Sequence, residues 1–532
     1  MARTPLFTVL RRSLRLAQHA NVSGEPADSA TDRWRDSMRM SRRAFVAGGT
    51  VVAAGLATGC APASRRPSSA TGGARADDEP IVIVGAGIAG LTCAYRLRAA
   101  GLPVLVMEAQ SRTGGRMYSL RNHFADGQVC ELGGELIDTG HSHIRALAGE
   151  LNIGLNDLAT DDPTLDDTVW FVDGVRRTEA DVVREFQPLA RRIEAALAPL
   201  GSSPDPTAAN PQGAVALDRM TLTQWFDQEG VSGWLRKLLD VAYTTEYGLE
   251  PDRQSALNFL LMIDSKAPPF HVFGDSDERF HVIGGNDRIV TTLADRVSAS
   301  IETEMVLESV TRRADGRHTL SFRRGASSRT VIARHVVLAL PFTLLRTVQL
   351  DVPMSPAKRR TINELGYGTN AKLMIGFSSR PWREQHRSNG SVVTDLPFQL
   401  SWETSRLQSG RAGILTNFSG GRHGLAVGDG TPAAQAAALV GDLERVFPGV
   451  TAARAGMTEA RFHWPTNPWV RGSYASYLAG QRTTMRGLEG EAVETLHFAG
   501  EHCSFDAQGY MEGGCETGMR VAEQLLGQRS RR

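Results

Sequence analysis

Three glycines lie close together in the motif Gly85-Ala86-Gly87-Ile88-Ala89-Gly90, which directly follows the apolar run 81–84. In a strand-to-helix turn, Gly85 permits the tight bend, Gly87 lets the backbone approach a pyrophosphate, and Gly90 lets the helix pack closely on the strand. The amides and the positive dipole at the start of such a helix attract phosphate. The spacing therefore predicts a dinucleotide-binding loop.

An acidic residue stands where such a loop needs one. Glu108 ends the next apolar run, 104–107, about twenty residues beyond the glycines. A carboxylate at this point accepts hydrogen bonds from a ribose 2′-hydroxyl and repels a 2′-phosphate. The pair of motifs predicts NAD or FAD and argues against NADP.

The elements that position this loop form a β-α-β unit. Ile81-Val82-Ile83-Val84 and Val104-Leu105-Val106-Met107 are short and wholly apolar, as in buried parallel strands, and residues 88–100 between them have a helical pattern. Further along, helical patterns cover 222–240 and 431–447, and strand-like runs cover 336–340, 373–377 and 414–418. These elements predict an α/β nucleotide domain that is interrupted by an α+β domain.

Several more motifs follow in order along the chain. They are Ser111-Arg112-Thr113-Gly114-Gly115-Arg116, Glu131-Leu132-Gly133-Gly134, Val336-Val337-Leu338-Ala339-Leu340-Pro341, Lys372, Gly472-Ser473-Tyr474, Phe498-Ala499-Gly500-Glu501 and the glycine-rich segment 509–518. With them, residues 80–528 resemble the flavin-containing amine oxidase family, which includes monoamine, polyamine and L-amino-acid oxidases. The resemblance implies FAD as the cofactor.

The same resemblance implies a Rossmann-like FAD-binding domain with an inserted α+β substrate domain. The FAD-binding domain is expected to comprise residues 80–155, 281–345 and 490–528. The substrate domain is expected to comprise a mainly helical part, 156–280, and a sheet part, 346–489. Residues 1–63 form an expected signal region, and residues 64–79 form a linker.

The family implies further contacts with the cofactor. Gly115 and Arg116 would approach the phosphates and the flavin, and Glu501 would accept from hydroxyl groups of the ribityl and phosphate-linked part. A helix predicted over 509–526, which contains Met511, would direct its N-terminal amides at the flavin pyrimidine. Covalently flavinylated relatives carry cysteine where this chain has Ser473, so FAD is expected to be non-covalent.

Three residues are expected to be catalytic by the same resemblance. Lys372 would hold a water near flavin N5, and burial would make it a partner in reoxidation by O2. Tyr474 and Tyr510 resemble the aromatic pair that flanks the substrate amine in monoamine oxidases. Two ring faces orient the amine and attract a cation.

The expected reaction transfers a hydride from the amine-bearing carbon to flavin N5. The resulting imine hydrolyses to aldehyde and ammonia, and O2 reoxidises the flavin and yields H2O2. Glu135 follows the Leu-Gly-Gly segment where amino-acid oxidases of the family tend to place arginine, and its carboxylate could bind a second substrate ammonium. An L-amino-acid oxidase stays open as the alternative, followed by a flavin-dependent dehydrogenase or desaturase and a non-catalytic flavin-binding protein.

Other chemistries lack support in the sequence. The net charge is +1, from 59 basic and 58 acidic residues, so the basic excess of a nucleic-acid-binding protein is absent. The chain has no HExxH or CxxC motif, no GxSxG motif and no Walker loop, and no metal site is predicted.

The N-terminal region has the pattern of a targeting signal. Ser41-Arg42-Arg43-Ala44-Phe45 precedes a weakly apolar run, 47–56, which is too short to span a bilayer. This pattern resembles a twin-arginine export signal, and it predicts recognition by that export machinery and a periplasmic or extracellular location. Cys60 lies in an imperfect lipobox, so a lipid anchor at this residue and cleavage near 61–63 are both open.

Overall fold

The computed structural model describes residues 79–201, 205–262 and 277–530, together with a few isolated positions between 16 and 32. The Arg42-Arg43 motif and Cys60 lie outside the described residues. The predictions of an export signal, a lipid anchor and a linker therefore stay predictions.

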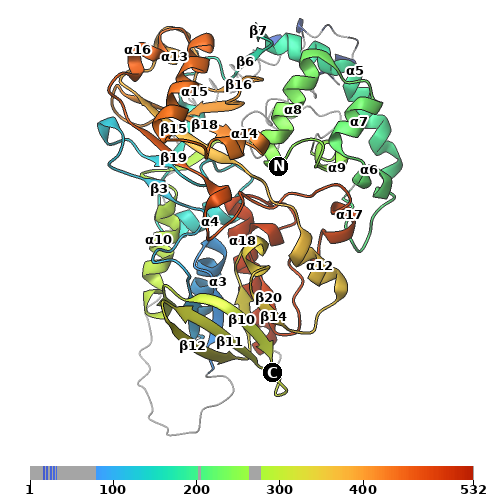
Figure 1. Ribbon diagram of the computed structural model, residues 1–532, viewed down its shortest axis with the longest axis vertical. Helices are drawn as coiled ribbons and strands as arrows, with labels where there is room; N and C mark the ends of the chain where they lie inside the picture. The colour runs from blue at the N-terminus through green and yellow to red at the C-terminus, as the bar shows by residue number, and fades with distance from the viewer. Residues whose placement is uncertain are drawn as a thin grey trace, which may run out of the picture.

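A five-stranded parallel sheet gathers segments from both ends of the described chain (Figure 1). Its strands, in spatial order, are β20 (Leu496–Phe498), β13 (Val336–Leu338), β1 (Ile81–Val84), β2 (Val104–Met107) and β9 (Ile301–Glu302). All four residues of β1 are buried, because helices cover both faces of a parallel sheet and leave only apolar positions.

Two helices from distant parts of the sequence pack together beside this sheet. They are α3 (Ile88–Ala99) and α18 (Met511–Ser530). A Cβ atom at Gly514 would lie 2.6 Å from the Ile88 side chain, and one at Gly518 would lie 2.3 Å from the Ala89 carbonyl oxygen. The glycines of α18 therefore allow the close approach that their spacing predicts.

A seven-stranded sheet occupies the opposite half of the molecule (Figure 1). Its strands, in spatial order, are β19 (Glu459–Phe462), β15 (Ala371–Phe377), β18 (Gly413–Ser419), β17 (Leu400–Glu403), β16 (Val392–Thr394), β6 (Val169–Val172) and β7 (Val175–Arg177). Every residue of β15 is buried, and this strand carries Lys372 between Phe418 of β18 and Phe462 of β19.

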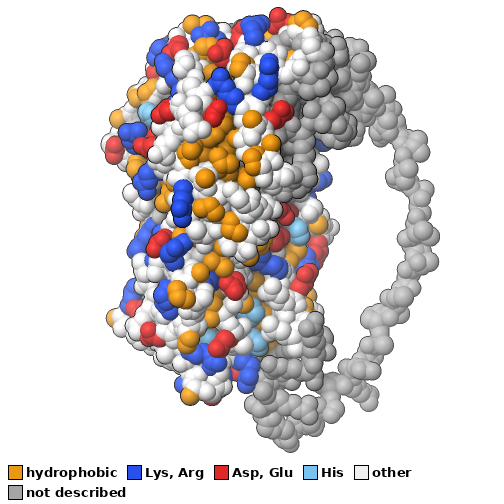
Figure 2. Space-filling model, turned by 90° about the vertical axis from the view of Figure 1, so that its right-hand side faces the viewer, with side chains coloured by type: hydrophobic (Ala, Val, Ile, Leu, Met, Phe, Trp, Pro, Cys, Tyr) orange, Lys and Arg blue, Asp and Glu red, His pale blue; other side chains and the backbone are white. Residues whose placement is uncertain are grey.

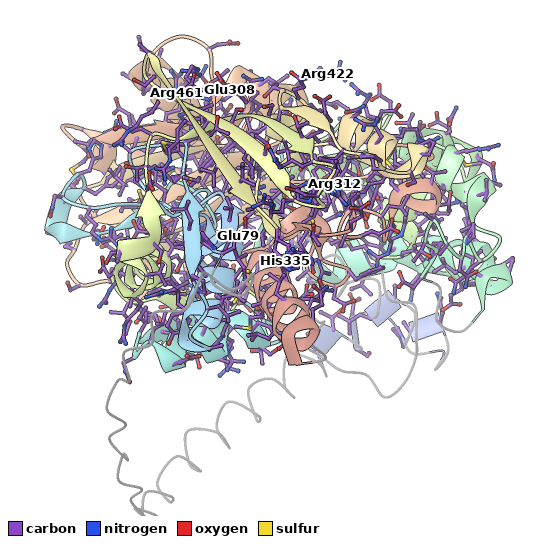
Figure 3. All side chains as sticks on the ribbon, turned by 90° about the horizontal axis from the view of Figure 1, so that it is seen from below. Glu79, Glu308, Arg312, His335, Arg422 and Arg461 are labelled. Carbon is purple, nitrogen blue, oxygen red and sulfur yellow. The ribbon has the colours of Figure 1, made fainter. Side chains whose placement is uncertain are left out.

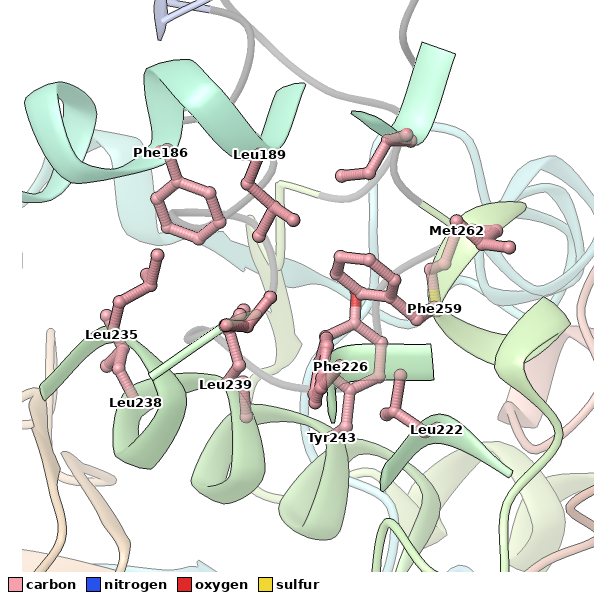
Figure 4. Packing of buried hydrophobic residues seen from close by; sticks show 14 of the residues in the cluster. Phe186, Leu189, Leu222, Phe226, Leu235, Leu238, Leu239, Tyr243, Phe259 and Met262 are labelled. Atoms are coloured by element: carbon pink, nitrogen blue, oxygen red, sulfur yellow. The ribbon is translucent and has the colours of Figure 1, made fainter. Parts of the chain in front are cut away.

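A helical layer packs beside the seven-stranded sheet. It contains α5 (Glu179–Leu197), α6 (Val215–Arg219), α7 (Leu222–Gln228), α8 (Gly233–Tyr247) and α9 (Ala256–Leu260). Figure 4 shows its core, where Phe186 and Leu189 of α5 face Leu235 and Leu239 of α8. The helical pattern predicted over 222–240 forms two helices, α7 and α8, because Gly230 adopts a left-handed φ of 65° between them.

A smaller sheet and several short elements complete the described fold. The four-stranded sheet has the order β12 (Ser327–Ala333), β11 (His318–Arg324), β10 (Val306–Arg312) and β14 (Gln349–Asp351). Figure 3 labels Glu308 and Arg312 on β10, which pair at the surface with Arg323 and Glu494. The shorter elements include β3 (Ser119–Leu120), β4 (Cys130–Glu131), α4 (Ser142–Glu150), β5 (Leu155–Asp157), β8 (Phe280–Val282) and α10 (Asp287–Arg296). The remaining helices are α11 (Phe342–Leu345), α12 (Pro356–Glu364), α13 (Pro381–Glu384), α14 (Gly421–Ala426), α15 (Pro432–Val446), α16 (Val450–Arg454) and α17 (Arg482–Met485).

Positive and negative side chains are interspersed over the face seen in Figure 2. Among the described residues, no helix is long and apolar enough to cross a bilayer, and no three potential metal ligands cluster together. The described cysteines, Cys93, Cys130, Cys503 and Cys515, are all buried and unpaired with one another. The architecture confirms the predicted α/β fold class.

Candidate active site

The glycine loop leaves the start of α3 open. Gly85 has φ +105°, and a Cβ atom at Gly90 would lie only 1.9 Å from the Gly85 carbonyl oxygen, so both positions require glycine. A Cβ atom at Gly87 would meet nothing within 4 Å, and no side chain caps the helix. The first-turn amides therefore face open space that fits a phosphate group.

Glu108, directly after β2, binds the backbone of this loop through its carboxylate. Its Oε2 accepts the Ala86 amide at 2.7 Å, and its Oε1 accepts the Gln110 amide at 2.8 Å. Burial raises the pKa of Glu108, and the two amide bonds oppose that rise. A carboxylate has about four lone-pair positions, so Glu108 retains capacity for a ribose hydroxyl.

Arg116 and Glu501, predicted separately as cofactor ligands, bind each other. Arg116 Nη1 donates to Glu501 Oε1 at 2.7 Å and to the Ser473 carbonyl oxygen at 2.9 Å. Glu501 Oε2 also accepts the Gly509 amide at 2.8 Å. The pair therefore joins the loop that contains Gly115 to the segment just before α18.

Most of the other residues that the sequence predicts to be functional line one cavity between the two large sheets. Its lining includes Arg116, Glu135, Lys372, Tyr474, Tyr510 and Met511. Gly85, Gly87, Gly90, Glu108, Gly115 and Glu501 do not line this cavity. The first four surround the start of α3, and Gly115 lies beside Gly87, because a Cβ atom at Gly115 would be 3.4 Å from the Gly87 Cα atom.

Met511, the first residue of α18, lies close to the Gly133-Gly134 turn. A Cβ atom at Gly134 would be 2.8 Å from the Met511 Cγ atom and 2.9 Å from its sulfur. A side chain at position 134 would require the Met511 side chain to move. The absence of a side chain at Gly134 therefore leaves room for the Met511 side chain beside the pocket.

Lys372 projects from β15 into the cavity wall and is only 4% exposed. Its Nζ donates to the carbonyl oxygens of Glu131 at 3.2 Å and Gly133 at 2.9 Å. It also donates to Glu135 Oε2 at 2.6 Å. The acceptors hold the lysine against the Leu-Gly-Gly segment.

Glu135 therefore binds a lysine of its own chain. Its Oε1 also accepts Trp402 Nε1 at 2.9 Å and Thr404 Oγ1 at 2.7 Å. Burial opposes ionisation of this carboxyl, but Lys372 and the two hydrogen bonds outweigh it and lower the pKa of Glu135. Lys372 thus already supplies the ammonium that Glu135 was expected to bind from a substrate.

The two predicted tyrosines both line the cavity. The Tyr474 hydroxyl donates to the carbonyl oxygens of Glu246 at 2.9 Å and Thr245 at 3.3 Å, at the end of α8. The Tyr510 ring meets the buried His141 ring edge-on, with 5.0 Å between centroids. Tyr474 is therefore held at its polar end, and Tyr510 is held at its ring.

Further residues of the wall were missed by sequence reasoning. Asp138 and Glu278 add carboxylates, and the Glu278 amide donates to Asp138 Oδ1 at 2.7 Å. Burial, with the neighbouring Asp138, Glu246 and Glu135, raises the pKa of Glu278 well above its usual range. Trp402 and Phe418 close the cavity from β17 and β18. No sequence motif marks Glu278, Trp402 or Phe418, but Asp138 lies in the same segment as Glu135.

Every cation among the described lining residues is paired within the protein. Arg116 pairs with Glu501, and Lys372 pairs with Glu135. Asp138 adds negative charge to the wall, whereas the raised pKa of Glu278 favours its neutral form. This arrangement attracts a cationic ligand more than an anionic one.

The chain is similar to known proteins over most of its length. A family described as flavin containing amine oxidoreductase matches residues 88–526. An L-amino acid dehydrogenase of Synechocystis is 25% identical over 84% of this chain and 94% of its own.

Two solved structures share the fold. Cyclohexylamine oxidase from Brevibacterium oxydans has a TM-score of 0.73 and 23% identity, covering 85% of this chain and 100% of its own. Putrescine oxidase bound to putrescine has a TM-score of 0.71 and 22% identity, covering 84% and 99%. The family implies a flavin, and the open space at Gly87 and the uncapped start of α3 fit its phosphate-bearing part.

Proposed function

The chain belongs to the family of flavin-containing amine oxidoreductases, and from this premise we propose that it binds FAD without a covalent bond and oxidises amines that carry no carboxylate group. The observation that carries this substrate class is the charge of the cavity. Its two cations are paired internally, while Asp138 adds a negative charge and Glu278, whose pKa is raised, adds one only when it ionises. An amino acid would bring its own carboxylate into this wall, and repulsion would weaken its binding.

The protein groups have distinct roles in the proposed reaction. FAD, when bound, accepts a hydride from the amine-bearing carbon, and its electrons then reach O2 with formation of H2O2. Tyr474 and Tyr510 bind and orient the amine between their rings. Trp402 and Phe418 exclude water from the same space. The acidic wall draws the protonated amine into the cavity before it reacts.

The non-covalent state of FAD rests on Ser473. Its hydroxyl donates to Asn370 Oδ1 at 2.7 Å, and it has no thiol to form a thioether with the flavin. Acid precipitation of the purified holoprotein is expected to leave the yellow colour in the supernatant. Colour that stays with the precipitated protein would contradict the proposal.

Matched substrate pairs test the amine class. The oxidised holoprotein is mixed without oxygen with cadaverine or L-lysine, and with 2-phenylethylamine or L-phenylalanine, while flavin absorbance is followed. Within each pair the two compounds differ only by the carboxylate. We expect at least one of the two amines to bleach the flavin about 100-fold faster than its amino-acid partner, a difference of about 2.7 kcal/mol. Equal or faster bleaching by the amino acids would overturn the charge argument.

L-amino-acid oxidation is the second candidate, and the relative named L-amino acid dehydrogenase favours it. It would keep the fold and the flavin chemistry but require a cation for the substrate carboxylate. Admitting air after bleaching separates an oxidase from a dehydrogenase. An oxidase recovers its colour and produces H2O2, whereas a dehydrogenase stays bleached until an artificial acceptor is added.

A further inference from the structure

The Lys372 ammonium has no hydrogen-bond donor left for another partner. A charged lysine has three N–H donors, and the acceptors are the Glu131 carbonyl, the Gly133 carbonyl and Glu135 Oε2. All three belong to one short segment. A water or a substrate could bind Nζ only by displacing one of them.

The carboxylate that pairs with Lys372 is itself fixed from a different strand. Trp402 Nε1 and Thr404 Oγ1 both donate to Glu135 Oε1, so the other oxygen is directed at the lysine. The Trp402 ring also lies 5.3 Å from Nζ and stabilises a cation there. The side chains of Glu135 and Lys372 are each only 5% exposed, so solvent does little to screen their attraction.

We propose that Glu135 is a positioning residue, which keeps the Lys372 ammonium charged and fixed, so that Lys372 acts in flavin turnover as a permanent positive charge and not as a proton carrier. A proton carrier needs a lone pair or a donor that faces its proton partner. All three hydrogen-bond partners of Nζ are acceptor oxygens of the protein itself. A fixed positive charge stabilises the negative charge that develops when electrons leave for O2.

Other titratable groups face this pair. Cys130 and the Glu131 carboxylate lie on β4, Asp138 and Glu278 lie across the cavity, and Arg116 lies at its cofactor end. The Glu131 carboxylate accepts from Ser119 Oγ and from the Asn286 amide, so it is directed away from Lys372. Glu135 is the only carboxylate among the described residues within ion-pair distance of Nζ.

The test measures flavin reoxidation without any amine. This inference rests on the proposed flavin binding but not on the amine class, because the holoprotein is reduced by light and then mixed with O2 between pH 6 and pH 10. The parent protein is expected to reoxidise at a rate that changes less than about twofold. In Glu135→Gln the buried ammonium loses its counter-charge and deprotonates at a lower pH. The rate is therefore expected to fall at least tenfold towards the alkaline side of this range.

Two comparisons isolate the role of Glu135. The double variant E135Q/K372M should match K372M at every pH, because Glu135 acts through the lysine. T404V removes one hydrogen bond to Glu135 but no charge, and it should keep the flat profile of the parent. A pH effect of E135Q that persists in the K372M background would overturn the proposal.

A spectroscopic readout and a second variant cover the case in which E135Q does not fold. The absorption spectrum of the oxidised bound flavin should be independent of pH in the parent and in K372R, because arginine stays charged throughout this range. K372R should reoxidise within about tenfold of the parent. A parent spectrum that titrates in this range, with the titration abolished by K372M, would show that Lys372 exchanges its proton and would overturn the proposal.

Discussion

At the scale of single residues, replacing two glycines of the same loop should affect different properties: one FAD affinity, the other the stability of the protein. A Cβ atom at Gly87 meets nothing in the protein, so Gly87→Ala should leave the stability of the apoprotein unchanged. The methyl group would occupy the space expected for a phosphate, and FAD affinity should fall about tenfold, or about 1.4 kcal/mol. Flavin titration and urea unfolding of the apoprotein measure the two effects.

Gly90→Ala is the matched control in the same loop. Its Cβ atom would lie 1.9 Å from the Gly85 carbonyl oxygen, so helix and strand would have to separate. We expect a loss of about 3 kcal/mol or more of unfolding free energy, with or without FAD. Equal losses of apoprotein stability in both variants would refute the assignment of Gly87 to phosphate binding.

His502 should make the protein sensitive to acid. Burial lowers the pKa of this histidine to about 3, and neither ring nitrogen has a hydrogen-bond partner among the described residues. The unfolded chain binds a proton here below about pH 6.5, whereas the folded chain stays neutral until about pH 3. Stability is therefore lost as the pH falls from 6.5 towards 3, by about 2 to 3 kcal/mol at pH 4.5.

His502→Phe isolates that contribution. The ring packs 4.3 Å from the Phe342 ring, so phenylalanine should be accommodated there. In urea unfolding, the difference in stability between pH 7 and pH 4.5 should shrink by about 2 kcal/mol in this variant. His423→Gln, at an exposed position, serves as the control and should leave that difference unchanged. An unchanged difference in H502F would show that this ring does not cause the acid loss.

The residue types in the site could be predicted from sequence, but their pairing could not. Lys372 and Glu135 were expected to act on flavin and substrate, yet they are 237 positions apart and bind each other. Arg116 and Glu501 are 385 positions apart and also form a pair. A motif indicates which side chain is present, whereas its partner depends on how distant strands and loops meet.

At the scale of elements, prediction succeeded where burial on both faces leaves a continuous apolar run. The runs 81–84 and 104–107 coincide with β1 and β2, and 373–377 lies within β15. Elements that depend on tertiary pairing were missed, such as the two-residue strands β3 and β4. Such strands carry too few residues to show a period.

One helix depends on a side chain from another. The first turn of α4 has no cap from its own chain segment, and Glu512 of α18 accepts the His143 and Ile144 amides at 2.9 and 2.8 Å. Glu512 also accepts from the His143 ring at 2.8 Å. Glu512→Ala should destabilise the protein by about 2 kcal/mol, because a buried helix start loses its acceptor and a favourable charge.

Glu512→Gln separates the acceptor from the charge. Glutamine retains one oxygen for an amide but no negative charge at the helix start, so its cost should be about half that of alanine. Both variants are compared by chemical unfolding. His143→Ala removes only the ring contact and should cost less than either, because that side chain is partly exposed. A cost below about 0.5 kcal/mol for E512A would show that α4 does not depend on this contact.

At the scale of the whole molecule, FAD should hold together segments that are remote in sequence. The five-stranded sheet takes strands from 81 to 498, and the expected FAD contacts lie after β1, after β2 and before α18. Free FAD at 100 times its dissociation constant should add about 2.7 kcal/mol of stability. Thermal unfolding of the apoprotein against rising FAD measures it, and riboflavin, which lacks the phosphates, should give a much smaller shift.

The expectation that FAD joins remote segments also gives a physical reason for the predicted route of export. A cofactor that joins remote segments must be inserted while the protein is folded, and the Arg42-Arg43 motif resembles the signal of a pathway for folded proteins. We propose that the holoprotein crosses the membrane already loaded with flavin. The substitutions R42K and R43K together should leave yellow, active protein in the cytoplasm of the producing cells.

A second arginine pair in the leader supplies the control. Arg11 and Arg12 are also adjacent, but an apolar segment of the export type follows residues 42 and 43 instead. R11K with R12K should therefore leave export unchanged, as measured by flavin fluorescence and activity outside the cytoplasm. Export that persists in R42K/R43K, or flavin-free protein exported by cells that lack the twin-arginine pathway, would contradict the proposed order, because insertion of FAD would then follow translocation.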